Sequence, residues 1–356
     1  MPQKTKTTTN INSHIVFYIM LFCLLLCWSG KQSYASDARL SSYPVVQTFI
    51  NKMVQQHQFN ANELTTLLDS TQLNADIIQS MQHPYEEQPW YVYQKHLVNQ
   101  KRIMLGVEYW KNHEKALNYA EKKYGVPAEI IVAIIGIESL YGHAHLKHPV
   151  LNTLATLGFS YTPRTAFFQN ELEQFLLLAR ELNVNPKSIY GSYAGAIGLP
   201  QFMPSSYRRF AIAYNPTFTS NSDNDSEVGN LFNDTDDVIV SVANYLNYFG
   251  WQKKQKVAIP AQITGDEYQE LLPTKLEPSY RINKLKKYGI KSTYQLPKAT
   301  KATLIKLQNE NSYEYWLGLN NFHVISRYNG NIQYIMAVDH LANEIKQQKT
   351  QASIDE

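Results

Sequence analysis

Cysteine is almost absent from this chain of 356 residues. The only two cysteines, Cys23 and Cys27, lie within the first 35 residues. Once that leader is removed, the remaining chain has no thiol and cannot form a disulfide, even in an oxidising compartment. Its stability must therefore come from a hydrophobic core, for which a chain of this length is ample.

A long apolar run is also lacking. The strongest candidate, Ile15 to Trp28, is shorter than the ~20 residues of a membrane-spanning helix. Lysines but no acids precede it, and Ser33-Tyr34-Ala35 supplies the small residues of a cleavage site. This pattern predicts a signal peptide over 1–35 and a periplasmic protein. An outer-membrane lipoprotein, processed at Cys27 or Cys23, is the alternative, but neither cysteine follows a small residue.

Excess charge of one sign is missing from the remainder of the chain. The net charge of +3 equals the three leader lysines, Lys4, Lys6 and Lys31, and without them 30 basic and 30 acidic side chains remain. Such a balance gives no electrostatic footprint for nucleic acid, which we exclude as a partner.

Helical periodicity dominates the chain. We expect an N-terminal helical region over 36–118 and a catalytic core over 119–255, where helical patterning is densest. Short apolar segments alternate with proline, glycine and lysine over 256–318, which predicts a small β-containing subdomain. A segment over 319–356 returns to the core. The fold class is α+β, mainly α. Specific helices are expected at 167–180, 236–251 and from Tyr334 to about Gln347, with a frayed polar end.

A glutamate falls on an apolar helix stripe. The segment 126–142 predicts one helix, with proline near its start and glycine as its stop. Glu138 follows Ile134 by four residues and Ile131 by seven, so its carboxyl shares the apolar face. Burial there would raise the carboxyl pKa and retain a proton, as a glycosidase acid requires. A half-exposed glutamate at a helix end is the simpler interpretation of this helix alone.

A glycine-rich stretch over 191–207 is the second unusual feature. Its close-spaced glycines let backbone approach a ligand or another backbone. Ser192 and Gln201 provide a hydroxyl and an amide, which suit sugar hydroxyl and N-acetyl groups. Tight helix packing, with Ser205 or Ser206 capping the next helix, is an equally simple explanation of the stretch.

Other chemistries find little support in the sequence. There is no G-x-S-x-G motif and no phosphate-binding loop. Two clusters resemble metal ligands only superficially. The histidine cluster has no acidic or cysteine partner nearby; it consists of His143, His145 and His148. The acidic cluster lacks glycine at the sixth position of a calcium loop; it consists of Asp223, Asp225 and Glu227. We therefore predict neither metal nor cofactor.

Four blocks together resemble the membrane-bound lytic murein transglycosylase B family, peptidoglycan-cleaving enzymes with a lysozyme-like helical domain. The blocks are Tyr124 to Gly142, Gly191 to Tyr207, Ser241 to Trp251, and Arg327-Tyr328-Asn329. Weaker similarity extends from about residue 40 to 345. The combination is specific, whereas no single block would be.

The resemblance implies roles for individual residues. Glu138 would be the catalytic acid and base. Positions lining the glycan cleft would be Ser192, Gln201, Tyr245 and Asn329, with Tyr328, Tyr93 and Arg164 as further candidates. Two departures stand out: Thr162-Pro163-Arg164 replaces the Pro-Arg-Arg common among relatives, and the acids of a calcium loop found in some relatives are out of register here.

The resemblance also implies a reaction, namely cleavage of the β-1,4 bond between N-acetylmuramic acid and N-acetylglucosamine to give 1,6-anhydromuramic ends. The matched blocks contain no second cleft acid, which fits a substrate that provides its own nucleophile. The partners would be peptidoglycan glycan strands and other cell-wall enzymes, and the protein would be a monomer. Two alternatives stay open: a lysozyme-type muramidase that uses water, and a non-catalytic peptidoglycan-binding protein.

Overall fold

The computed structural model describes residues 39–82, 88–215 and 228–355. The predicted signal peptide and the acids at 223, 225 and 227 lie outside these ranges. The principal helices are α2 (Pro44–His57), α3 (Ala61–Asp69), α4 (Ala75–Gln82), α5 (Trp90–Leu97), α6 (Gln100–Asn112), α7 (Glu114–Tyr124), α8 (Ala128–Ser139), α9 (Val150–Ser160), α10 (Thr165–Glu181), α11 (Pro204–Phe210), α12 (Thr235–Tyr248), α13 (Ile282–Lys287), α14 (Asn320–Ser326) and α15 (Ile332–Asp355).

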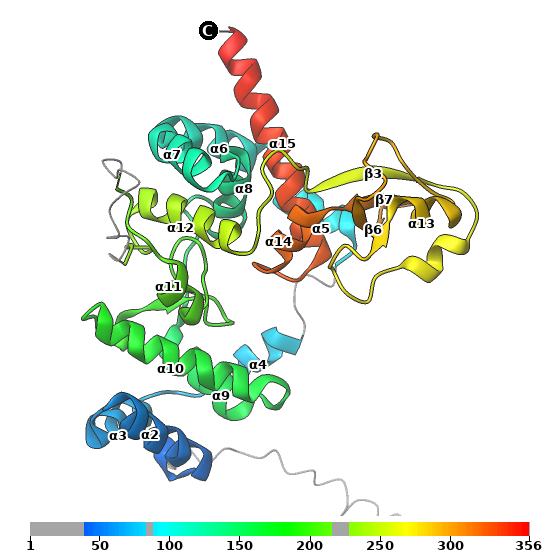
Figure 1. The fold of residues 1–356 in the computed structure, drawn as a ribbon. Coiled ribbons are helices and arrows are strands. Elements are labelled where there is room, and N and C mark those ends of the chain that lie inside the picture. The colour runs from blue at the N-terminus through cyan, green and yellow to red at the C-terminus, as the bar shows by residue number, and fades with distance from the viewer. Residues whose placement is uncertain (1–38, 83–87, 216–227, 356) are drawn as a thin grey trace, which may run out of the picture.

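Most helices share one hydrophobic core, and we call this part of the molecule the helical body (Figure 1). Helix α8 lies at its centre and contacts α6, α7, α12 and α15. Residues 130–136 of α8 are all buried, so the helix has no solvent-facing stripe. The long α15 packs against α5, α6 and α8, which returns the end of the chain to the core. None of the described helices is both long and apolar enough to cross a membrane.

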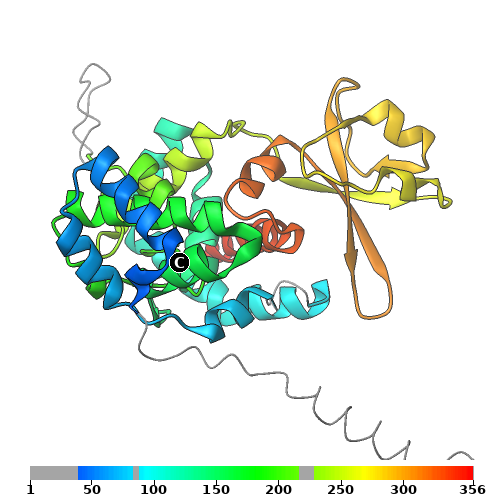
Figure 2. The ribbon, with the colours of Figure 1, turned by 90° about the horizontal axis from the view of Figure 1, so that it is seen from below.

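A five-stranded antiparallel sheet forms a second unit, the β subdomain, to one side of the helical body (Figure 2). The strand order is β4-β6-β7-β3-β5. The bounds are β3 (Ala258–Ile263), β4 (Tyr280–Arg281), β5 (Ile290–Ser292), β6 (Lys301–Gln308) and β7 (Tyr313–Gly318). Alternate side chains of these strands, with α13, enclose a separate and smaller cluster that includes Leu285, Leu304 and Leu317. A short pair, β1 (His148–Pro149) and β2 (Tyr190–Gly191), belongs to the helical body.

The chain turns sharply after α8. Leu140 and Tyr141 both take left-handed backbone angles, with φ of 49° and 58°. The Tyr141 ring folds back over Gly136 and Gly106, where an added Cβ would lie 2.4 and 2.5 Å from its hydroxyl oxygen. That hydroxyl donates to the Arg102 carbonyl at 3.0 Å. The two glycines therefore make room for a ring that fixes the end of α8.

The predicted fold class is confirmed, since the described chain is mainly helical with a small antiparallel subdomain. The helices expected at 167–180 and 236–251 are α10 and α12, with small changes at their ends. The predicted domain boundaries stay predictions.

Several details were predicted wrongly. The helix expected to stop at Gly142 ends at Ser139, because the left-handed residues terminate it earlier. Helix α11 begins at Pro204 with Met203 as its N-cap, so neither serine at 205 or 206 caps it. Helix α14 was not foreseen, and α15 continues to Asp355 instead of ending near Gln347.

Candidate active site

A cavity of about 570 Å³ opens between α8, α10, α12, the glycine-rich stretch and the α14–α15 turn. It brings together seven of the eight predicted site residues, which come from distant parts of the sequence: Glu138, Arg164, Ser192, Gln201, Tyr245, Tyr328 and Asn329. The eighth, Tyr93, is not among the residues that line it. Tyr93 lies on α5 and is 3% exposed, within the core of the helical body.

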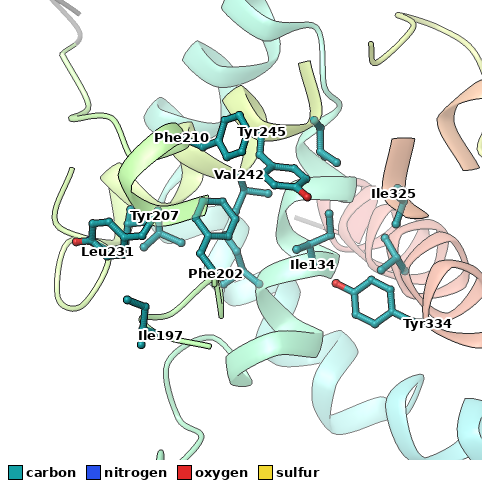
Figure 3. Close-up of a cluster of buried hydrophobic side chains, with 14 of the residues drawn as sticks. Ile134, Ile197, Phe202, Tyr207, Phe210, Leu231, Val242, Tyr245, Ile325 and Tyr334 are labelled. Atoms are coloured by element: carbon teal, nitrogen blue, oxygen red, sulfur yellow. The ribbon is translucent and has the colours of Figure 1, made fainter. Parts of the chain in front are cut away.

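Glu138 stands in the last turn of α8 and is half-buried. The Tyr334 hydroxyl, from the first turn of α15, donates a hydrogen bond of 2.6 Å to its Oε1. Figure 3 shows Tyr334 beside Ile134, with its hydroxyl directed toward α8. Burial raises the pKa of Tyr334 well above its ordinary value, and the Glu138 charge raises that pKa further. Tyr334 is therefore a permanent donor to the carboxyl at physiological pH.

Tyr334 was missed as a site residue by sequence reasoning. It is 196 positions from Glu138, and it entered the prediction only as the expected start of the last helix. No local pattern connects the two residues, because their contact depends on how α15 packs on α8.

An aromatic group forms one wall of the cavity and joins three segments. Tyr245 on α12 lies 5.0 Å from the Tyr328 ring and 5.4 Å from the Phe202 ring, between centroids. The Tyr245 hydroxyl donates to the Arg327 carbonyl, and the Tyr328 hydroxyl donates to the Pro200 carbonyl. Burial is the first cause of the raised pKa of both phenols. These tyrosines thus hold the wall in place with their hydroxyls engaged.

The glycine-rich stretch presents a fixed serine to the cavity. The Ser192 Oγ accepts the backbone amides of Ala194 and Ala196, at 3.2 and 3.1 Å. A Cβ at Gly191 would lie 2.1 Å from the Ala196 carbonyl oxygen, so this close backbone approach requires glycine. Because both lone pairs of the Ser192 oxygen are used, its proton is what it offers to a ligand.

Two side-chain amides complete the polar lining. The Gln201 Nε2 donates to the Gly198 carbonyl at 2.7 Å, which fixes an otherwise flexible side chain. The Asn329 Oδ1 accepts the Asn331 amide at 3.0 Å, an Asx turn that leads into α15. With this oxygen engaged in the turn, the amide N–H groups are what Asn329 has to offer a ligand.

Arg164 lies at the exposed rim, in the turn before α10. Its guanidinium covers the Phe167 ring at 4.1 Å and is 5.4 Å from the Phe168 ring. Both rings line the cavity, and Phe167 is 37% exposed. The rim therefore combines a positive charge with a partly exposed aromatic ring, a surface that suits sugars and their anionic substituents.

A second carboxylate lines the cavity, outside the blocks that carried the resemblance. Glu171 on α10 is 2% exposed, and it accepts both the backbone N–H and the hydroxyl of Ser205, at 2.9 and 2.7 Å. Burial raises its pKa, while these hydrogen bonds oppose the rise. Glu171 ties α11 to α10. The sequence could have indicated that Glu171 is buried, because it follows Phe168 by three positions and precedes Phe175 by four, on the buried face of α10.

The residues that could hold a metal are few in the part of the chain that the structure describes. Over that part, no three histidine, cysteine, aspartate or glutamate side chains gather as metal ligands would. The acids at 223, 225 and 227 lie outside it.

Known proteins resemble this chain over most of its length. The model of the family "Transglycosylase SLT domain" matches residues 41–343. The chain is 36% identical over 314 residues to "Membrane-bound lytic murein transglycosylase B" of Escherichia coli (strain K12), covering 85% of this chain and 82% of that protein. Among solved structures, soluble lytic transglycosylase SltB1 from Pseudomonas aeruginosa has a TM-score of 0.77 at 38% identity, covering 86% of this chain and 100% of that one. The Escherichia coli lytic transglycosylase Slt35 in complex with bulgecin A has a TM-score of 0.76 at 37% identity, covering 86% of this chain and 94% of that one.

Proposed function

Because the chain belongs to the transglycosylase SLT domain family and is a lytic transglycosylase of peptidoglycan, we propose that Glu138 is the single acid and base of its reaction. One observation carries the proposal: the Glu138 carboxyl lines the cavity while Tyr334 holds its Oε1. A carboxyl kept in one orientation can protonate a leaving oxygen without first reorganising.

The reaction follows from one carboxyl acting twice. Glu138 protonates the glycosidic oxygen between N-acetylmuramic acid and N-acetylglucosamine, and the C1–O bond breaks. The substrate's N-acetyl oxygen stabilises C1 as an oxazolinium-like species. The Glu138 carboxylate then removes the proton from the muramic 6-hydroxyl, whose oxygen attacks C1 and displaces the N-acetyl group. The product is a 1,6-anhydro sugar, the proton returns to Glu138, and no water is consumed.

The remaining lining residues bind and orient the glycan. Ser192 and Asn329 donate hydrogen bonds to Glu138 or to the N-acetyl oxygen, while Gln201 contacts sugar hydroxyls. Hydrolytic glycosidases pair two carboxyls. The second carboxyl here, Glu171, already accepts both donors of Ser205, which supports a nucleophile from the substrate.

The oxygen source tests this reaction. Digestion of purified sacculi in ¹⁸O-water is expected to give muramic ends with no heavy oxygen at C1, lighter by one water than hydrolytic ends. Intramolecular attack by a positioned hydroxyl lowers the barrier by several kcal/mol relative to attack from solution. Predominant ¹⁸O incorporation would instead identify a lysozyme-type muramidase, and no cleavage at all would indicate a binding protein.

We further propose that the chain is exported and cleaved after Ala35 to act on glycan strands in the periplasm. The leader's lysines, apolar run and small residues support this. Intact-mass analysis is expected to find a mature N-terminus at Ser36. A diacylglyceryl group on Cys27 would show lipoprotein processing instead.

A further inference from the structure

One arginine joins the ends of two helices. Arg102 lies in the first turn of α6, and its guanidinium donates hydrogen bonds to three backbone carbonyls. The Nε group donates to the Gly136 carbonyl in the last turn of α8, at 3.0 Å. The Nη1 group donates to the His96 and Leu97 carbonyls at the end of α5, both at 2.9 Å. We call this set of bonds the helix-end junction.

The charge of Arg102 is balanced by these carbonyls and not by an acid. None of the ion pairs formed by the described residues includes Arg102. Its guanidinium is partly buried, and this burial lowers its pKa. The C-terminal end of a helix carries partial negative charge, so two helix ends that face one guanidinium stabilise it. Loss of the guanidinium would therefore release α5 and α8 from each other at one point.

The last turn of α8 is a segment that needs such support. Gly136 lies two residues before Glu138, and glycine weakens a helix more than any residue except proline. From the chain that follows it, the Gly136 carbonyl accepts the Leu140 N–H at 3.2 Å. Arg102 adds a second and charged donor, which makes a stronger hydrogen bond than a neutral one. The guanidinium thus restrains the turn from which the Glu138 side chain projects.

The end of α5 leads to the same part of the molecule. Helix α5 carries Tyr93, and α15, which carries Tyr334, packs against both α5 and α8. Burial and the Glu138 charge are the leading causes of the raised pKa of Tyr334, and Tyr93 contributes to the same rise, so the two phenols lie near each other. A shift of α5 relative to α8 would therefore move these tyrosines relative to the carboxyl that Tyr334 holds.

We propose that Arg102 is a positioning residue of the reaction, which fixes the end of α8 to the end of α5 and so holds the Glu138 carboxyl against the Tyr334 hydroxyl. The proposal rests on the proposed function, because the position of this carboxyl affects turnover only if Glu138 is the acid. Arg102 is not among the residues that line the active-site cavity, so it acts through Glu138 and Tyr334 and not through contact with the glycan. A small misplacement of a reacting group is enough to slow the chemical step.

A conservative variant tests the junction. Arg102→Lys keeps the charge but loses the planar fork that reaches two helix ends at once. On soluble glycan strands it is expected to lower kcat about tenfold while KM stays within about a factor of two, because the glycan contacts are unchanged. Arg180→Lys is the matched control, since Arg180 donates to the carbonyl of His57, the last residue of α2, at 2.7 Å. Both variants are expected to lower Tm, but only Arg102→Lys should lower kcat.

The pH dependence of kcat shows whether Arg102 acts through the carboxyl. A weakened hydrogen bond from Tyr334 lets Glu138 keep its proton to higher pH, so the alkaline limb of the profile should move upward in Arg102→Lys. In a Tyr334→Phe background that bond is already absent. Arg102→Lys should then cause no further movement of the limb, because two changes that act through one contact are not additive.

The outcomes are distinct. A lower kcat at constant KM, with a limb that moves in the wild-type background but not in Tyr334→Phe, supports the proposal. An equal loss of kcat in Arg180→Lys, a normal kcat in Arg102→Lys, or a limb that stays in place overturns it, as does a limb that moves equally in both backgrounds.

Two further measurements keep the test decisive. Should Arg102→Lys fail to fold, Tyr141→Phe provides the same comparison, because it keeps the ring but removes the hydroxyl that donates to the Arg102 carbonyl. Failure of the proposed function is detected separately, since the wild-type enzyme would then yield no 1,6-anhydro ends or Glu138→Gln would keep its turnover.

Discussion

The helical body and the β subdomain hold their functional side chains in different ways. Helix α8 is buried on every side, and the turn that follows it is filled by Tyr141, so Glu138 projects from a support with little freedom. The β subdomain encloses its own small cluster, while the other face of β6, with Ile305 and Leu307, belongs to the core of the helical body. Chemistry needs a carboxyl fixed within fractions of an ångström, and the packing around α8 provides such a support.

The sharpest test of this contrast is the loss of the acid itself. Glu138→Gln keeps the volume of the side chain but removes the transferable proton, so turnover of sacculi should fall at least ~10²-fold. Glu129→Gln is the control, since Glu129 lies in the first turn of the same helix and pairs with Lys346. Comparable turnover by wild type and Glu138→Gln, measured as soluble anhydro products, would remove Glu138 from the mechanism.

The next largest effect should come from Asn329, which lines the active-site cavity in the turn between α14 and α15. Its amide protons are proposed to orient the reacting groups, so Asn329→Ala should lower kcat roughly tenfold, with a smaller change in KM. Asn329→Asp separates two roles, because it retains the oxygen that accepts the Asn331 amide but loses the donor. Normal kcat in the aspartate variant would reduce Asn329 to a turn residue.

Tyr334→Phe should have a smaller effect on maximal turnover but should change its pH dependence. The phenol hydrogen bond stabilises the ionised form of Glu138. Without it the carboxyl holds its proton to higher pH, and the alkaline limb of the kcat profile should move upward. A profile that stays in place, or moves downward, would show that the bond does not bear on the catalytic proton.

Asp339 should affect stability without affecting turnover. It lies on α15 beside a cavity between the helical body and the β subdomain, and burial raises its pKa to about 7. The folded protein thus binds this proton more tightly than the unfolded chain, and stability should decline as pH rises from about 4 to 7. Asp339→Asn should abolish that decline, which is at most about 4 kcal/mol at ~1.4 kcal/mol per unit. Urea unfolding at pH 5 and pH 8 measures it, and an unchanged pH dependence in the variant would contradict the assignment.

The periodicity of apolar residues predicted the secondary structure, which depends mainly on residues close together in the sequence. The spacing of apolar residues along short segments predicted the helix that carries Glu138, the helices α10 and α12, and the region of the strands. It did not predict the contacts that complete the site. The bond from Tyr334 to Glu138 and the bonds from Ser205 to Glu171 join residues whose proximity is decided by helix packing. Tyr93, which the resemblance suggested for the cleft, is buried on α5 and stays a prediction.

The sequence separation between Glu138 and Tyr334 has a kinetic consequence for the folding chain. The first residue belongs to the middle of the polypeptide and the second to its last helix, so their hydrogen bond is among the non-local contacts that close slowly. A chain emerging N-terminus first presents α8 long before α15. The Glu138 carboxyl therefore acquires its phenolic partner only when α15 docks, so this hydrogen bond is among the last contacts that the folding chain can form.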